Sequence, residues 1–151
     1  MQRLAAHGVD AARIGFVPYR QRAEYLRSYH DIDIGLDTFP YNGHTTSLDS
    51  LWMGVPTLTK VGETCVGRGG LSQLFQLELL EFAAESDLGV VAAATALAGD
   101  LPRLADLRAG LRSRLEKSPL MDAARFARGI EAAYRELWKT HCQARGATAA
   151  T

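Results

Sequence analysis

The fold of this chain is decided by residues 37–60, which read Asp37-Thr-Phe-Pro-Tyr-Asn-Gly-His44-Thr45-Thr46-Ser-Leu-Asp49-Ser-Leu-Trp-Met-Gly54-Val-Pro56-Thr-Leu-Thr59-Lys60. An apolar stretch that ends at Leu36 precedes a loop containing Pro and Gly, and the loop opens into a segment with helical character. Gly54 and Pro56 are typical of the stop between a helix and a following strand. The stretch therefore predicts a strand, a helix and a second strand in close succession.

The residues around this stretch extend the same alternation. We expect strands over 13–17, 31–36 and 57–60, and helices over 2–7, 20–29 and 45–53, the first of them ending at Gly8. Strands and helices that alternate through short links are typical of a parallel sheet with right-handed crossovers. The sequence thus predicts an α/β fold in which half of a Rossmann-like parallel sheet is present.

After Gly70 the pattern becomes helical. Helices are expected over 71–85, 88–98, 101–117 and 122–144, and leucines recur on one face of the third, at Leu101, Leu104, Leu107, Leu111 and Leu115. We divide the chain into a Rossmann-like nucleotide-binding half, 1–70, a helical C-terminal part of the same lobe, 71–145, and a disordered tail, 146–151. Because a doubly wound sheet normally begins with a strand and this chain begins with a helix, we expect a piece of a longer protein.

The composition excludes several classes of function. The chain has 151 residues, of which 47% are apolar and 23% charged, as in an ordinary globular domain. Its 17 basic and 17 acidic residues cancel, so no global field attracts nucleic acid or an anionic membrane. No apolar run approaches the roughly 20 residues of a membrane span, and residues 1–8 lack the apolar h-region of a signal peptide. We expect a cytoplasmic protein without nucleic-acid or membrane partners.

The cysteines and histidines indicate neither a disulfide nor a metal site. Cys65 and Cys142 are far apart in the sequence, and two such cysteines in a cytosolic protein are usually reduced. The four histidines lack the spacing of metal ligands. We therefore expect no metal and no cofactor.

The beginning of the helix at Thr45 is the candidate binding site. The first amides of a helix lack intrahelical partners and lie at the positive end of its dipole, so they favour a phosphate. In this interpretation Thr45 and Thr46 hold a diphosphate, His44 donates to it, and Asp49, one turn later, accepts from a ribose hydroxyl. The alternative is a simple capping sequence with a solvated Asp49, since Thr and Asn are common caps.

Two groups of charged residues leave alternatives open. Arg20 and Arg22 follow the strand expected at 13–17, where they either reach a nucleotide or lie on a solvated helix face. Glu63 and Arg68 flank a Gly-rich loop beyond another strand, and Arg68 pairs either with Glu63 or with a phosphate.

The stretch from Asp37 to Thr59, followed by Gly62-Glu-Thr, closely resembles the C-terminal catalytic lobe of the O-GlcNAc transferase and SPINDLY family of protein O-glycosyltransferases. The resemblance extends from about Arg13 into the last helix, where it includes Ser118-Pro119-Leu120 and Tyr134-Arg-Glu-Leu-Trp138. It implies a GT-B enzyme, in which two Rossmann-like lobes face a cleft and tetratricopeptide repeats usually precede them. Such an enzyme transfers a sugar, with inversion, from a nucleotide diphosphate to Ser or Thr of proteins.

The resemblance also implies roles for individual residues. The His-Thr-Thr triplet would contact the donor diphosphate as the catalytic group, and Asp49 would hold the ribose. The remaining base and ribose contacts fall on Arg20, Arg22 and Tyr25. Arg22 stands where O-GlcNAc transferases tend to have Lys, and Tyr25 where they have His, so this wall of the base pocket differs.

Together these features predict the donor-binding fragment of an inverting glycosyltransferase. The donor is expected to be UDP-GlcNAc, with GDP-fucose as the alternative, and the acceptor Ser or Thr of a protein. A missing N-terminal catalytic lobe would complete the enzyme, so we expect the isolated chain to be inactive. A different class of function is a non-catalytic interaction module whose C-terminal helices dock on a partner chain.

Overall fold

The computed structural model describes residues 2–148, and their side chains as far as residue 145. Its helices are α1 (Gln2–Ala5), α2 (Arg22–Arg27), α3 (Thr45–Trp52), α4 (Gly69–Gln76), α5 (Asp87–Gly99), α6 (Leu101–Lys117) and α7 (Ala123–Thr148). Its strands are β1 (Gly35–Asp37), β2 (Thr57–Lys60) and β3 (Ala83–Ala84). Short 3-10 helices occupy Ala11–Arg13, Ser28–Asp31, Cys65–Gly67, Leu80–Phe82 and Pro119–Met121.

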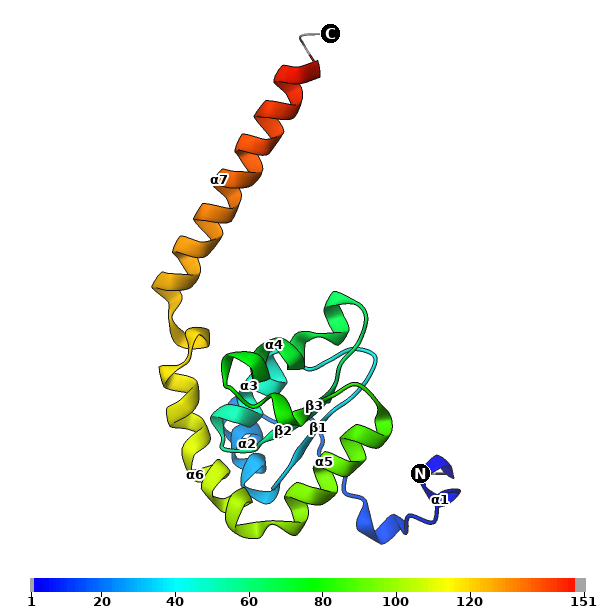
Figure 1. The fold of residues 1–151 in the computed structure, drawn as a ribbon. Helices are drawn as coiled ribbons and strands as arrows, with labels where there is room; N and C mark the ends of the chain where they lie inside the picture. Colours follow the sequence, from blue (N-terminus) through cyan, green and yellow to red (C-terminus); the bar gives the residue numbers. More distant parts are fainter. Residues whose placement is uncertain (1, 149–151) are drawn as a thin grey trace.

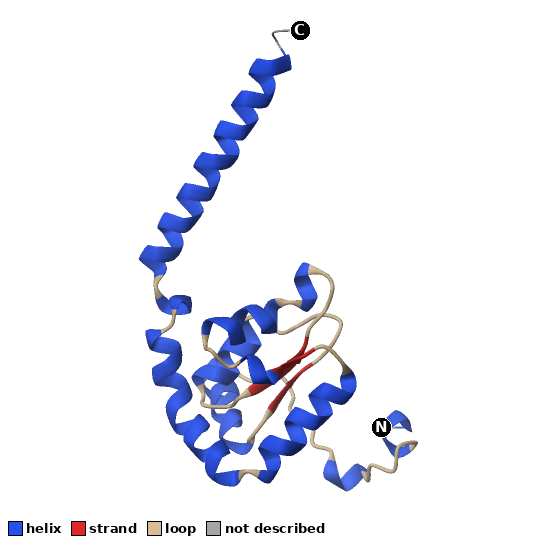
Figure 2. Cartoon of the chain, viewed as in Figure 1, coloured by secondary structure: helices blue, strands red, loops and turns tan. Residues whose placement is uncertain are grey.

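The three strands form one parallel sheet in the order β1-β2-β3. Gly35 of β1 lies opposite Thr57 of β2, and Thr59 of β2 lies opposite Ala83 of β3. The sheet is at the centre of the body with helices around it (Figure 2). This arrangement confirms the predicted α/β class with a partial parallel sheet followed by C-terminal helices.

The turn between α3 and β2 requires glycine. Gly54 has a φ of +79°, and a Cβ there would lie 2.7 Å from the carbonyl oxygen of Arg108 in α6. Only a residue without a side chain fits this conformation and this close approach. Gly54 and Pro56 therefore end α3 as predicted, and the turn that contains Gly54 also packs closely against α6.

The predicted strand at 13–17 is wrong. Residues 14–21 have no regular structure, and Phe16 and Val17 are 75% and 61% exposed. A strand needs a neighbour for its backbone hydrogen bonds, and no described strand lies beside this segment. The strand expected at 31–36 is also displaced: the 3-10 turn at Ser28–Asp31 prolongs α2, and β1 begins only at Gly35.

The helix expected over 71–85 is much shorter. It ends at Gln76, and Glu78 then adopts a φ of +56°, which breaks the helical backbone. Ala83 and Ala84 beyond this turn pair with Thr59 and Lys60 as strand β3, which was missed. Alanine favours helices, but here pairing with β2 overrides that propensity.

The other C-terminal helices follow the prediction closely, and α6 has the predicted bounds. α7 continues to Thr148, three residues into the expected tail, and 149–151 lie outside the described residues. Among residues 2–148 no single helix is long and apolar enough to cross a membrane, although the bent pair α5 and α6 meets that test when the two are counted together.

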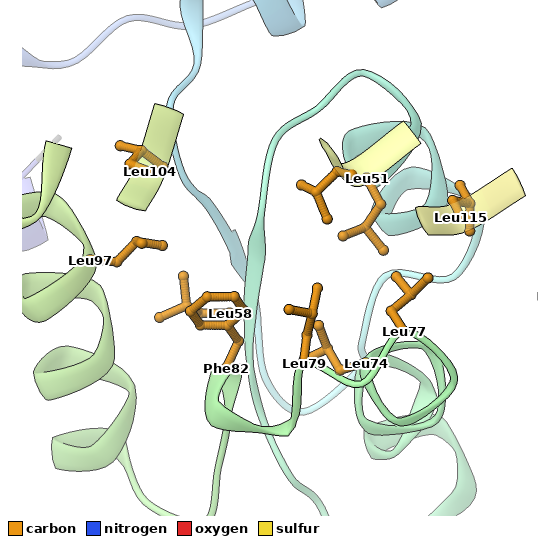
Figure 3. Packing of buried hydrophobic residues seen from close by; sticks show 10 residues of the cluster. Leu51, Leu58, Leu74, Leu77, Leu79, Phe82, Leu97, Leu104 and Leu115 are labelled. Atoms are coloured by element: carbon orange, nitrogen blue, oxygen red, sulfur yellow. The ribbon is translucent and has the colours of Figure 1, made fainter. Parts of the chain in front are cut away.

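The hydrophobic core surrounds β2, where Leu58 and Thr59 have no exposed surface. Figure 3 shows two groups of side chains on either side of the central strand: Leu97 and Leu104 lie near Phe82, whereas Leu51, Leu74, Leu77 and Leu115 lie on the opposite side. Of the leucine face predicted on α6, Leu104, Leu111 and Leu115 are buried and Leu101 is 68% exposed. α6 thus closes the core at its edge.

α7 projects away from this body (Figure 1). None of its described side chains is buried, and Phe126, Tyr134, Leu137 and Trp138 are each at least 65% exposed. These residues and Ile130 recur at helical spacing, so α7 presents an apolar face that the rest of the described chain leaves uncovered.

We expect Leu111→Ala in α6 to lower the free energy of unfolding by about 2–5 kcal/mol, since it leaves a cavity in the core. Leu101→Ala in the same helix removes a side chain that is 68% exposed, and we expect a change within about 0.5 kcal/mol. Urea denaturation of both variants measures the difference. Equal losses at the two positions would contradict the assignment of the core.

Candidate functional site

The beginning of α3 faces a cavity at the carboxyl edge of the strands. The cavity has a volume of about 670 Å³ and is lined by the end of β1, the loop that follows it and the first turn of α3. His44, Thr45 and Thr46 are all among its lining residues. Ligands of open α/β sheets bind outside this edge, and the volume lies in the range of small-molecule sites.

The first turn of α3 is open. No side chain caps the helix, and its first backbone hydrogen bond runs from the Leu48 amide to the His44 carbonyl oxygen at 3.1 Å. The amides of Thr45, Thr46 and Ser47 therefore have no intrahelical acceptor. A capping role for the two threonines, the alternative left open by the sequence, is not what the structure shows.

Asp37 holds the loop before α3 in place through two hydrogen bonds. One carboxylate oxygen accepts from the Gly43 amide at 2.6 Å, and the other accepts from the Thr59 hydroxyl at 2.8 Å. The carboxylate thus joins the end of β1 to the end of β2 and to the residue before the N-cap of α3. Charge-assisted bonds of this kind are short and strong, so they fix the direction in which α3 starts.

Asp49 is paired with Arg22. The two guanidinium nitrogens of Arg22 donate to the two carboxylate oxygens at 2.6 and 2.7 Å. The Asp49 side chain is 11% exposed and that of Arg22 is 64% exposed. The hydrogen bonds that Arg22 donates to Asp49 raise the pKa of Arg22, so its guanidinium stays charged. Asp49 is therefore not a solvated helix charge.

Two tyrosines connect α2 to α3. The hydroxyls of Tyr25 and Tyr29 are 2.6 Å apart, and that of Tyr29 donates to the Thr46 carbonyl oxygen at 3.2 Å. Burial raises the pKa of Tyr29 far above its ordinary value, and the hydrogen bond with Tyr25 adds to the effect. Tyr29 is thus a neutral phenol that anchors α2 against the first turn of α3.

The residues that the resemblance assigns to the base line a second hollow of about 570 Å³. Arg20, Arg22 and Tyr25 all border it, and Tyr29 borders both this hollow and the cavity at α3. The guanidinium of Arg22 also lies 5.7 Å from the centre of the Tyr25 ring. The structure therefore brings every predicted site residue except Asp49 to the lining of one of two adjoining hollows, and Asp49 is bonded to Arg22 of the second hollow.

The Gly-rich loop has a structural role. The Arg68 guanidinium donates to the Gly62 carbonyl oxygen at 3.2 Å, and within residues 2–148 no ion pair joins it to Glu63.

Cys65 and Cys142 are both free thiols. No group of three or more His, Cys, Asp or Glu among the described residues could hold a metal ion.

Sequence reasoning missed the residues that support the site. Tyr29 and Gln73 hold the first turn of α3 from segments 17 and 29 residues away, and Asp37 joins the nearby Gly43 to Thr59, which is 22 residues away. Asn42 is 1% exposed and accepts from the Gly70 amide at 3.4 Å through its side-chain oxygen. Two sequence features could have indicated these supporting residues: a polar residue at the end of a strand, and a polar residue on the apolar face of a short helix.

Residues 1–130 match the family model described as Glycosyl transferase family 41. This chain belongs to glycosyl transferase family 41. The resemblance noted in the sequence is therefore confirmed, and the family 41 match covers the sheet, the helices α4 to α6 and the beginning of α7.

Individual relatives agree with the family 41 assignment. The SPINDLY protein of Oryza sativa subsp. japonica, named a probable UDP-N-acetylglucosamine–peptide N-acetylglucosaminyltransferase, is 38% identical over 94% of this chain. The UDP-N-acetylglucosamine–peptide N-acetylglucosaminyltransferase of Caenorhabditis elegans is 33% identical over 89% of it. This chain spans only 15% and 12% of those two proteins.

A solved structure shows the same architecture. A mutant O-GlcNAc transferase from Thermobaculum terrenum matches with a TM-score of 0.86 and 38% sequence identity. The match covers 94% of this family 41 chain and 27% of the solved chain. The fold described above is thus that of one part of an O-GlcNAc transferase.

The raised pKa of Tyr29 gives a testable pH dependence. Because its folded-state pKa lies above the ordinary value of 10.0, the neutral phenol favours the folded chain; this contribution is complete below about pH 10 and is lost as pH rises toward the folded pKa. We expect Tyr29→Phe and wild type to show the same tyrosinate absorbance at about pH 11 and to differ only at higher pH.

Tyr19→Phe, which removes a phenol that is 91% exposed, calibrates the signal of a single tyrosine. If Tyr29→Phe has already lost one tyrosine's absorbance at about pH 11, Tyr29 is not the shielded group that the structure describes.

Proposed function

We propose that this chain forms the donor-nucleotide half of an inverting protein O-glycosyltransferase. The donor is a nucleotide diphosphate sugar, with UDP-GlcNAc preferred over GDP-fucose, and the acceptor is a Ser or Thr hydroxyl of a protein. The names of the Oryza and Caenorhabditis relatives, which specify UDP-N-acetylglucosamine and a peptide, support this choice. The activity belongs to the longer protein of which such a chain is one part.

The observation on which the proposal rests is the open first turn of α3. Three amides without intrahelical partners and the hydroxyls of Thr45 and Thr46 are available at one cavity wall. A diphosphate placed there gains several hydrogen bonds and the favourable end of the helix dipole. Hydrogen bonds to charged groups contribute roughly 1.5–3 kcal/mol each, so a few of them suffice for micromolar binding.

The ribose fits the pair formed by Asp49 and Arg22. Each carboxylate oxygen of Asp49 keeps a free lone pair beside the one that Arg22 occupies, so it can accept from a ribose hydroxyl. The base would extend into the hollow lined by Arg20 and Tyr25, where an aromatic ring and a guanidinium offer stacking surfaces. Donor phosphate and donor base would thus occupy the two adjoining hollows.

The same groups supply the chemistry of sugar transfer. When the glycosidic bond breaks, negative charge develops on the leaving diphosphate. Amides fixed in advance at the start of α3, with His44 beside them, stabilise that charge without reorganisation, and this is commonly the largest catalytic contribution. The residues of this site can neutralise the leaving group without a metal.

We expect the isolated chain to bind UDP weakly and without turnover, since only half of the pocket is present. Asp49→Ala removes the ribose acceptor and leaves Arg22 unpaired, and we expect at least about a tenfold loss of affinity. Asp106→Ala, on the exposed face of α6, is the matched control. Isothermal titration calorimetry with UDP measures all three proteins.

Identical heats for wild type and Asp49→Ala would remove the site assignment. A loss of affinity in Asp106→Ala as large as that in Asp49→Ala would show a general effect of charge rather than a contact with ribose.

A second candidate function is a non-catalytic interaction module, and the exposed apolar face of α7 favours it. A helix of 26 residues that buries none of its described side chains gains little stability from the rest of the chain. Phe126, Ile130 and Leu137 lie along one face of it and suit a groove or another helix on a partner.

If α7 docks on a second copy of the chain, the sedimentation coefficient should rise with protein concentration and should not respond to UDP. Leu137→Glu places a charge on the apolar face and should abolish that rise, whereas Arg135→Glu on the polar side should not. A monomer at every concentration would exclude self-association through α7.

A further inference from the structure

His44 lies between two helices. Its backbone forms the N-cap of α3, whereas its ring extends toward the first turn of α4. The ring also meets the edge of Tyr41, with ring centres 5.9 Å apart. Neither contact involves the helix that His44 caps, so α3 alone does not determine where the imidazole lies.

The His44 ring packs against Gly69, the first residue of α4. A Cβ at Gly69 would lie 2.8 Å from Cε1 and 3.0 Å from Nε2 of His44. Real side chains essentially never approach so closely, so the ring occupies space that exists only because residue 69 has no side chain. The φ of Gly69 is not in the left-handed region, and the glycine is therefore not required for backbone conformation.

Gln73, one turn further along α4, holds the backbone of the same residue. Its side-chain nitrogen donates to the His44 carbonyl oxygen at 3.0 Å. The Gln73 side chain is buried, and its oxygen has no partner among the described residues. A buried amide with one unmet acceptor costs free energy, and the bond that the same amide donates to the His44 carbonyl oxygen offsets part of that cost.

We propose that the first turn of α4 sets the position of His44 at the donor diphosphate, with Gly69 as the positioning residue for the ring and Gln73 for the backbone. The proposal rests on the function proposed above, in which His44 donates to the diphosphate. Neither residue touches the donor; each acts only through His44.

Gly69→Ala tests the contact with the ring. Alanine suits a helix better than glycine, so the variant should be at least as stable as wild type, while the new methyl group displaces the imidazole. We expect its dissociation constant for UDP to rise about tenfold, which corresponds to the loss of one good hydrogen bond. Gly110→Ala in α6, where a Cβ meets nothing within 4 Å, is the matched control and should bind UDP as wild type does.

A double-mutant cycle separates positioning from a general structural effect. In a His44→Ala background the ring is gone, so Gly69→Ala should change UDP affinity by less than about twofold. An equal loss in the presence and absence of the ring would overturn the proposal. Gln73→Leu, which also removes the unmet oxygen, should weaken UDP binding without loss of thermal stability; a wild-type affinity would overturn the role of Gln73.

NMR of the imidazoles tests the geometry without any ligand. The chain has four histidines, so the ring signals can be assigned individually. We expect a nuclear Overhauser effect between the Hε1 of His44 and the α-protons of Gly69, and a shifted His44 signal in Gly69→Ala. Absence of both would overturn the contact. If both are present and wild type fails to bind UDP, the donor function fails while the positioning of His44 by α4 stands.

Discussion

The parallel pairing of β2 with a strand on each side is the interaction on which the rest of this structure depends. β2 is buried, and α4 and α5 both pack against it, so it fixes the directions of β1 and β3 and the edge at which all three strands end. Because parallel strands end at the same edge, the loops after β1 and β2 meet there. The Thr59 hydroxyl of β2 then bonds to Asp37 at the end of β1, and Asp37 in turn accepts from the Gly43 amide and orients the start of α3.

In the proposed function, a chain without net charge provides a binding site for an anion. Two carboxylates, Asp37 and Asp49, lie close to the first turn of α3, and each is occupied by donors from the protein. These carboxylates already pair with a backbone amide, a hydroxyl and a guanidinium, so in the proposed function the unpaired amides of α3 would attract the anion. The neutral phenol of Tyr29 adds no charge where it contacts the helix.

Much of this could be predicted from the sequence wherever local signals and tertiary packing agree. α3, β2 and α6 lie where Gly54, Pro56 and Ser118-Pro119 mark their ends, and the His44 to Asp49 segment lies at the expected edge. β3 escaped prediction because two alanines become a strand only beside Thr59 and Lys60. Gly69 and Gln73 escaped because they reach His44 from a distant segment, and Asp37 escaped because its role depends on Thr59 of another strand; no local pattern reveals such contacts.

The two sides of the site, the start of α3 and helix α2, differ in how firmly the rest of the chain holds them. This difference suits them to different roles. The side proposed for the diphosphate is held by contacts within the chain: Asp37 accepts from the Gly43 amide, and Gln73 of α4 donates to the His44 carbonyl oxygen. The base side is built from α2, a helix of six residues in which Arg22 is largely exposed. A rigid site gives affinity at a low entropic cost, whereas an exposed wall accepts substitution without loss of the core. In the function proposed above, affinity for a diphosphate would therefore depend on the sheet and α3, and the choice among nucleotides would depend on α2, where Arg22 and Tyr25 can change while the start of α3 stays intact.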